Sequence, residues 1–180
     1  MSFDNASLFP ITVGVNNEDH LVLGGCDVVE LASRFGTPLY VFDEETLRNV
    51  CREFVHEFSS RYDNTQVVYA SKAFLNPAVA RLMAEENLGL DVVSGGELVV
   101  AQTAEFPPGA IYFHGNNKGT DELKMAIEYG RLTIVVDGFH ELKMLNELAG
   151  AGSAVQDIML RVSPSVDPHT HVHTTTGILD

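Results

Sequence analysis

The feature that most limits the fold of this chain is a repeated alternation of short apolar runs with amphipathic stretches. A short apolar run bounded by turn residues is typical of a buried strand, whereas apolar residues at every third or fourth position indicate a helix with one buried face. Strands that alternate with helices favour an α/β protein. They predict a parallel sheet whose two faces are both covered.

The expected elements follow one another along nearly the whole chain. Strands are expected at residues 38–43, 66–71, 88–94, 110–115, 132–137 and 157–163. Helices are expected at residues 27–35, 44–62, 77–86, 96–104, 120–129 and 139–149. Asp27 and Asn76 have the side chains of helix N-caps, and Gly36 fits a helix end. The run HLVLGG at residues 20–25 fits one more short strand before this series.

Two architectures fit such an alternation, a (βα)8 barrel and an open doubly wound sheet. A complete barrel takes about 250 residues, so a barrel built from this chain would be incomplete, with about five or six strand–helix units. No GxGxxG pattern follows the first strand. That absence disfavours the dinucleotide-binding form of the doubly wound sheet.

The composition excludes several classes of partner. Aspartate and glutamate number 25 against 11 lysines and arginines, which gives a net charge of -14. Such an acidic chain is not expected to bind nucleic acid or an anionic membrane. We see no apolar run long enough for a membrane span and no signal peptide. Cys26 and Cys51 lie far apart without CxxC spacing, which favours a reduced, cytoplasmic setting.

Chemically useful side chains stand where the expected strands end. In parallel α/β folds, functional residues gather at the carboxyl ends of the strands, because the loops there converge on one edge. The residues at these ends include Lys72, Asp91, His114, Asp137 and Arg161. An amine beside apolar strand walls loses its proton more readily and can then form a Schiff base with an aldehyde. Lys72 is therefore the leading candidate, and its alternative is a solvated loop lysine.

The other strand-end residues each have two interpretations. Asp91 could support the Schiff base or a nearby histidine, or be a turn residue. His114 could contact a cofactor or simply end its strand. Arg161, late in a strand expected to be buried, needs an anionic partner, which could be a cofactor oxygen or an internal carboxylate such as Asp91. The amides of Gly95 and Gly96 at a helix start could hold an anion.

The histidines near the end of the chain offer a weaker metal hypothesis. His169, His171 and His173 have the HxHxH spacing, which places alternate residues on one face of a strand. An exposed tail is the preferred interpretation, so no metal site is expected.

Five sequence segments, in the same order and spacing, resemble the diaminopimelate decarboxylase family of fold-type III pyridoxal-phosphate enzymes. YASKAFLNP resembles the lysine motif of that group, and LDVVSGGEL, FHGNNK and MLRVSPSVDPHTH resemble three further signatures. FGTPLYVFDEETLR is similar to the start of the family's barrel. The segments occupy residues 69–77, 90–98, 113–118, 159–171 and 35–48.

The resemblance implies an incomplete (βα)8 barrel of the alanine-racemase type with pyridoxal 5'-phosphate as cofactor. It implies decarboxylation of meso-2,6-diaminopimelate to L-lysine and CO2, and a homodimer for the full-length family. Lys72 would hold the cofactor, and Asp91 would lie close to both. Arg161 would support the ring-hydroxyl side, and His114 is a further candidate cofactor contact.

The resemblance covers the N-terminal portion of the family only. Its glycine-rich phosphate loop and the residues that complete its site are not found before Asp180. We expect residues 1–26 to form an N-terminal segment, with a first strand of the family's β domain, and residues 27–180 to form a partial barrel domain. Such a chain is expected to be poorly active alone. The alternatives are another basic amino-acid decarboxylase of the ornithine or arginine type, a racemase, or a non-catalytic half-barrel that self-associates.

Overall fold

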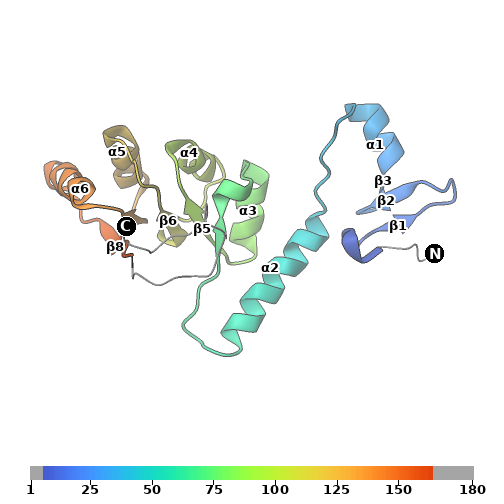
Figure 1. Ribbon diagram of the computed structural model, residues 1–180, viewed down its shortest axis with the longest axis horizontal. Coiled ribbons are helices and arrows are strands. Elements are labelled where there is room, and N and C mark those ends of the chain that lie inside the picture. Colours follow the sequence, from blue (N-terminus) through green and yellow to red (C-terminus); the bar gives the residue numbers. More distant parts are fainter. Residues whose placement is uncertain (1–5, 164–180) are drawn as a thin grey trace. The chain divides into compact units, whose positions relative to one another are not determined.

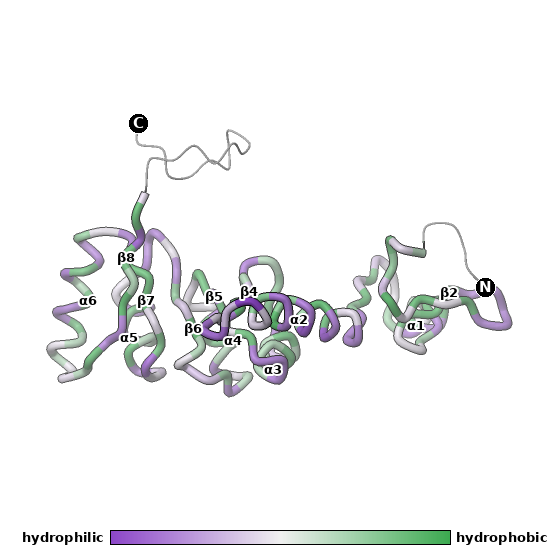
Figure 2. Tube along the Cα trace, turned by 90° about the horizontal axis from the view of Figure 1, so that it is seen from below, coloured by the Kyte–Doolittle hydropathy of each residue, from purple (hydrophilic) through white to green (hydrophobic). Residues whose placement is uncertain are grey.

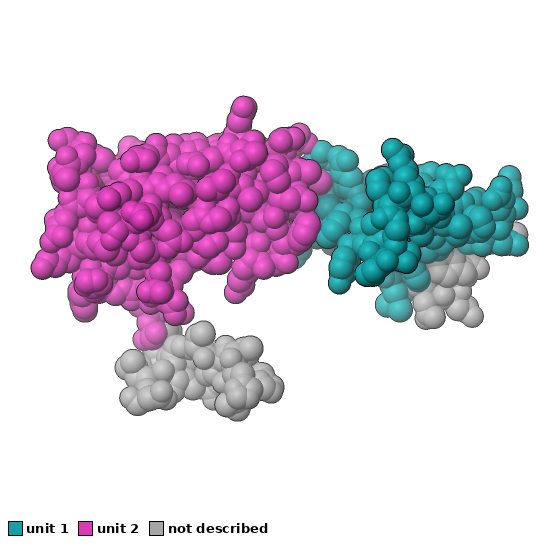
Figure 3. All heavy atoms as spheres, turned by 90° about the horizontal axis from the view of Figure 1, so that it is seen from above, with its two compact units in different colours: residues 1–65 teal, residues 66–180 magenta. Residues whose placement is uncertain are grey.

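The computed structural model describes residues 6–163 and divides the chain into two compact units, residues 1–65 and residues 66–180 (Figure 3). Each unit contains its own sheet. This division follows contacts within each unit. It does not test the expected domain boundary between residues 26 and 27, which stays a prediction.

The first unit contains a three-stranded antiparallel sheet and two helices (Figure 1). The strand expected near residues 20–25 is present as the middle strand of this sheet. Asp27 is the N-cap of the first helix, and its side chain accepts hydrogen bonds from the backbone of Val29 and Glu30. The elements are η1 (Ala6–Leu8), β1 (Gly14–Val15), β2 (Leu21–Leu23), β3 (Cys26–Asp27), α1 (Val28–Phe35) and α2 (Glu44–Ser59).

Residues 38–43 do not form the strand that their composition predicts. The apolar side chains at residues 39–42 are exposed rather than buried, Tyr40 most of all at 89%. A strand exists only where its backbone groups find a neighbouring strand, and neither described sheet includes this segment. Pro38 also has no N–H to donate. An apolar run without a sheet neighbour therefore remains irregular.

The second unit repeats strand and helix as the sequence predicts. Asn76 is the N-cap of its first α-helix, with its side chain accepting from Val79 N. The strands are shorter than predicted, because only their central residues pair with a neighbouring strand. The elements are β4 (Val68–Ala70), η2 (Ser71–Ala73), α3 (Pro77–Glu85), β5 (Gly89–Val92), α4 (Gly95–Thr103), η3 (Pro108–Ala110), β6 (Ile111–Phe113), α5 (Thr120–Tyr129), β7 (Thr133–Val136), α6 (Phe139–Ala151) and β8 (Asp157–Leu160).

The strand order of the second unit decides between the two architectures. The sheet runs β4-β5-β6-β7-β8, and every neighbouring pair is parallel. Each strand thus pairs with the next one along the chain, as in a (βα)8 barrel. A doubly wound sheet would instead reverse its order at a switch point. The sheet has open edges within the described residues.

The helices α3 to α6 lie along one face of this sheet (Figure 1). Val92, Phe113 and Ile134 point toward these helices and are fully buried. In Figure 2 the tube of α6 alternates between hydrophobic and hydrophilic residues, as expected for a helix with one face on a sheet. The prediction that both faces are covered is wrong for the described residues, because a barrel arrangement puts all the helices outside.

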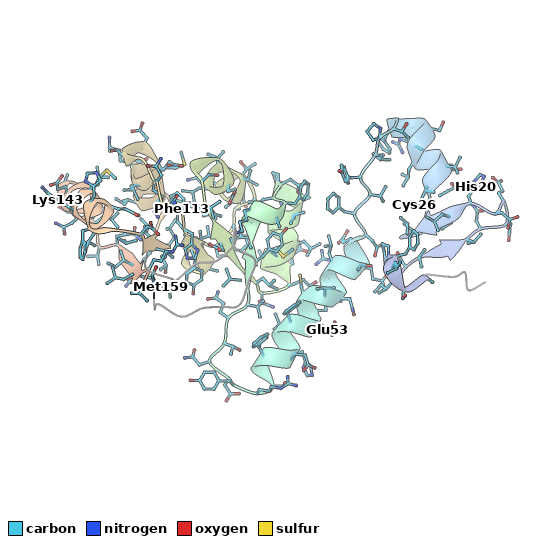
Figure 4. The ribbon with its side chains drawn as sticks, viewed as in Figure 1. His20, Cys26, Glu53, Phe113, Lys143 and Met159 are labelled. Carbon is cyan, nitrogen blue, oxygen red and sulfur yellow. The ribbon has the colours of Figure 1, made fainter. Side chains whose placement is uncertain are left out.

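The opposite face of the sheet carries the alternate residues of each strand. Asp91, Tyr112 and Thr133 are neighbours in register on this face and are only partly buried. Met159 of β8 belongs to the same face, whereas Phe113 belongs to the helix-covered one (Figure 4). β8 was expected to be buried, but its residues Ile158, Met159 and Leu160 are exposed. It is the edge strand of the described sheet, so no further strand shields it.

Candidate active site

The predicted site residues of the second unit lie at or just beyond the carboxyl ends of its strands, Asp91 within the last two residues of β5. His114 N donates to Val92 O at 2.8 Å, and Arg161 N donates to Val136 O at 2.9 Å. These bonds extend the ladder by one residue beyond β6 and β8. Because side chains alternate along a strand, His114 and Arg161 project on the helix-free face together with Asp91.

Asp91 and His114 form a direct contact across β5 and β6. Nδ1 of His114 donates to Oδ1 of Asp91, since an ionised carboxylate can only accept. The bond fixes the proton of the imidazole on Nδ1 and orients the ring. Both side chains remain partly accessible, at 42% for His114 and 28% for Asp91. Of the two interpretations of Asp91, support of a nearby histidine matches this geometry.

Arg161 pairs with a carboxylate that the sequence argument did not assign to it. Its Nη1 lies 2.7 Å from Oδ1 of Asp137, which directly follows β7. The partner is an internal carboxylate, as predicted. Asp91 as the example is wrong, because the register places Asp137 beside Arg161 and Asp91 two strands further away. A cavity of about 220 Å³ adjoins the pair, between the ends of β7 and β8 and the start of α6.

Lys72 lies in the 3-10 turn that follows β4, next to the strand that carries Asp91. Its side chain is exposed, and it has no hydrogen bond or ion pair with another described residue. The apolar walls expected around it are not formed by the described residues, because the sheet does not close around it. Its amine is therefore accessible to a ligand, but the described residues do not shield it from water.

Two backbone N–H groups at the start of α4 already donate hydrogen bonds to side chains. Gly95 N donates to Oε1 of Glu122 at 2.7 Å, and Glu97 N donates to Oγ of Ser94 at 3.3 Å. A side chain at Gly95 would meet the Glu122 side chain, 3.1 Å from its Cγ. The suggestion of an anion site on the amides of Gly95 and Gly96 is therefore wrong for Gly95. Glu122 lies on the next helix, and its reach could not be read from local spacing.

Sequence reasoning also missed a buried lysine behind the site. Lys118 belongs to the FHGNNK segment, which resembles a family signature but gives no local sign that the lysine is buried. Its side chain is 1% exposed and forms an ion pair with Glu141 of α6. Glu141 in turn accepts from the backbone N of Asp137 at 3.1 Å. A lysine inside a glycine- and asparagine-rich turn resembles a surface residue, so only its tertiary surroundings identify it as buried.

A further acid–histidine group lies in the first unit. Oδ2 of Asp27 accepts from Nδ1 of His20 at 2.8 Å and from Nδ2 of Asn16 at 2.7 Å. Glu18, His20 and Asp27 lie close enough together to form a three-residue cluster. The Asp27 oxygens are engaged by these donors and by the start of α1, so the group is a hydrogen-bond network within the fold. The histidines at residues 169–173 lie outside the described residues.

Comparison with known proteins identifies the family. The family described as "Pyridoxal-dependent decarboxylase, pyridoxal binding domain" matches residues 45–180. The chain belongs to this family. The pyridoxal-dependent decarboxylase match begins within α2 and includes all the strands of the parallel sheet.

Two relatives show which enzymes of the family the chain resembles in sequence. Diaminopimelate decarboxylase of Bacillus methanolicus is 47% identical over 166 residues, which are 92% of this chain and 38% of that protein. The same enzyme of Synechocystis sp. is 43% identical, over 98% of this chain and 39% of that protein. The chain thus spans less than half the length of these relatives.

A solved structure supports the barrel interpretation. Diaminopimelate decarboxylase of M. jannaschii, in complex with L-lysine, superposes with a TM-score of 0.77 at 36% identity. The match covers 89% of this chain and 38% of that one. The predicted fold, an incomplete barrel of this family, is confirmed.

Among residues 6–163, the helices are too short or too polar to span a membrane.

Proposed function

We propose that this chain supplies the pyridoxal-phosphate lysine of a diaminopimelate decarboxylase. Such an enzyme converts meso-2,6-diaminopimelate to L-lysine and CO2. One observation carries the proposal: Lys72 offers an exposed, unpaired amine among the described residues, at the strand-end edge that also holds Asp91 and His114. The family match supports it, since the family is described as pyridoxal-binding.

The side chains at this edge fit the cofactor. Its aldehyde requires a primary amine, which Lys72 supplies. Its anionic oxygens require a cation, and Arg161 stands at the same edge with only Nη1 engaged by Asp137 among the described residues. When bound, the cofactor supplies an electron sink for the electron pair released as CO2 leaves.

The remaining residues act by orientation. Asp91 holds the proton of His114 on Nδ1 and thereby sets the plane of the imidazole that faces the site. Asp137 holds the guanidinium of Arg161 in one direction and partly balances its charge. Two acid–base pairs on neighbouring strands therefore prearrange the edge before a ligand arrives.

Diaminopimelate is favoured over other basic amino acids by the relatives. The matches at 43–47% identity are diaminopimelate decarboxylases. A lysine/ornithine decarboxylase of Vibrio vulnificus is only 21% identical and supports the fold alone. The L-lysine in the M. jannaschii complex is the product that we propose for this enzyme.

We extend the proposal to the assembly and the compartment. The family resemblance favours a homodimer in a cytoplasmic setting, and the absence of a disulfide at Cys26 and Cys51 agrees with a reducing compartment. A molar mass of two chains, measured by light scattering, would support the dimer. Larger and variable masses would favour the self-associating half-barrel instead.

The test of the cofactor lysine is spectroscopic. The purified chain is mixed with pyridoxal phosphate, reduced with borohydride, and mapped by mass spectrometry. We expect a visible absorbance band before the reduction and a covalent label on Lys72 after it, both lost in Lys72→Ala. Lys124→Ala is the matched control, since Lys124 is also an exposed lysine on the same unit. A band and label that persist undiminished in Lys72→Ala would sink the proposal. Release of CO2 from diaminopimelate is then assayed on the protein that binds the cofactor.

A further inference from the structure

Lys118 is a charged side chain buried directly behind the candidate site. Its Nζ donates to Gly115 O at 2.6 Å and to Val135 O at 2.8 Å. Oε1 of Glu141 lies 2.9 Å from the same nitrogen. A buried ammonium is costly unless its protons and its charge are matched. The two carbonyl oxygens accept its protons, and the Glu141 carboxylate balances its charge.

Glu141 is buried as well and divides its two oxygens between different partners. Oε1 faces the Lys118 ammonium as an ion pair, although the approach does not have hydrogen-bond geometry. Oε2 accepts from the backbone N of Asp137. One carboxylate therefore connects the Lys118 ammonium with the turn between β7 and α6.

Each end of this connection lies beside one of the two acid–base pairs. Gly115, whose carbonyl accepts from Lys118, directly follows His114. Asp137, whose amide is held by Glu141, carries the carboxylate that pairs with Arg161. The buried pair thus fixes the backbone at both His114 and Asp137.

The loop at Gly115 leaves little freedom for other arrangements. Gly115 has φ +115°, and a Cβ there would lie 3.0 Å from Val93 O. The backbone at Gly115 therefore lies close to Val93, which directly follows β5 and comes two residues after Asp91. A small displacement of this loop would carry His114 away from Asp91.

We propose that the buried Lys118–Glu141 pair is a positioning device for the active site, which holds His114 against Asp91 and Asp137 against Arg161. What those four residues then do rests on the proposed function. A buried ion pair is often no more stabilising than apolar side chains of the same volume, so stability alone does not account for it. Its directional bonds to Gly115 and Val135 provide what apolar packing lacks, a fixed loop position.

The experiment compares the double variant Lys118→Met/Glu141→Leu with the wild-type chain. The double variant removes both charges together, so neither is left buried and unpaired. Lys124→Met is the matched control, because it removes a lysine charge at a site that is 52% exposed. One measurement is made without cofactor, the ¹⁵N ring signals of His114, which report the bond from Nδ1 to Asp91. The other is the dissociation constant for pyridoxal phosphate, read from the visible band.

In the double variant we expect a changed ratio of the two His114 ring signals and a dissociation constant raised about tenfold or more, since a small misplacement of a site can cost about a hundredfold. The control should change neither. A folded double variant whose His114 signals and dissociation constant both equal those of the wild type would overturn the proposal.

A measurement on the wild-type chain keeps the test decisive if the double variant does not fold. The Lys118 ammonium should exchange its protons slowly and give a resolved ¹⁵N signal, because it is enclosed by three oxygens. Exchange as fast as that of Lys124 would overturn the proposal. Failure of the proposed function is distinguishable, because loss of the Lys72 label would leave the His114 signals and the Lys118 exchange unaffected.

Discussion

Arg161 Nη1 lies 2.7 Å from Oδ1 of Asp137, so β7 and β8 end in an ion pair on the helix-free face of the sheet. Both side chains are partly exposed, at 49% and 27%. Exposed pairs of this kind contribute about 0–1 kcal/mol to stability, because water screens them and ordering two side chains costs entropy. The pair therefore matters for the direction of Arg161 more than for the fold.

Asp137→Asn should separate these two effects. We expect the free energy of unfolding, measured by urea titration, to change by less than about 1 kcal/mol. The affinity for pyridoxal phosphate should fall, because Arg161 is no longer held in one direction. Asp121→Asn is the control, since the Asp121 side chain is 99% exposed. Equal affinities of the two variants would contradict the orienting role.

Lys118→Met should be far more damaging to stability than any exposed substitution. It leaves the Glu141 carboxylate buried without its cation, which typically costs about 3–5 kcal/mol. Adding Glu141→Leu should recover most of this loss, since the unpaired charge is then gone. Urea unfolding of the two single variants and of the double variant gives the coupling. Additive effects of the two substitutions would argue against the ion pair.

Gly115→Ala should strain the loop between β6 and α5. The φ of +115° is rarely adopted by residues with a side chain, and the new Cβ would crowd Val93 O. We expect a loss of about 1–3 kcal/mol in the free energy of unfolding. Gly150→Ala is the contrasting case, because Gly150 lies in α6 with open space around it and alanine favours a helix. A milder effect at Gly115 than at Gly150 would refute the strain.

The pair of His20 and Asp27 should make the first unit sensitive to pH. The bond to Asp27 raises the pKa of His20, although partial desolvation opposes the rise. Partial desolvation would by itself raise the pKa of Asp27, but its hydrogen bonds, first among them the one from His20, lower it. The His20 contribution is thus full below its ordinary pKa of about 6.5 and is lost as pH rises through the raised value. The Asp27 contribution is full above about pH 3.9 and is lost as pH falls through the lowered value.

These signs define a window for the measurement. The difference in melting temperature between the wild type and His20→Gln should be largest between about pH 4 and 6.5 and should shrink toward alkaline pH. His140→Gln is the control on the other unit. A difference for His20→Gln that stays constant from acid to alkaline pH would mean that the pair does not titrate as described.

Local sequence patterns predicted the helices and their caps better than the strands. The helix at residues 120–129 begins and ends as expected, and the caps at Asp27 and Asn76 form the hydrogen bonds that their side chains suggest. These features succeed because capping and amphipathic periodicity depend on residues within a few positions of one another. The segment at residues 38–43 failed because a strand depends on a partner elsewhere in the chain.

The order of strands and helices, and the placement of Lys72, Asp91, His114 and Arg161 at strand ends, were determined by the sequence alone. Only the tertiary structure decided which of these residues meet. It paired Arg161 with Asp137, occupied the Gly95 amide with Glu122, and buried Lys118 against Glu141. The physical reason is that ion pairs and buried charges form across neighbouring strands and helices, between residues that no local period connects.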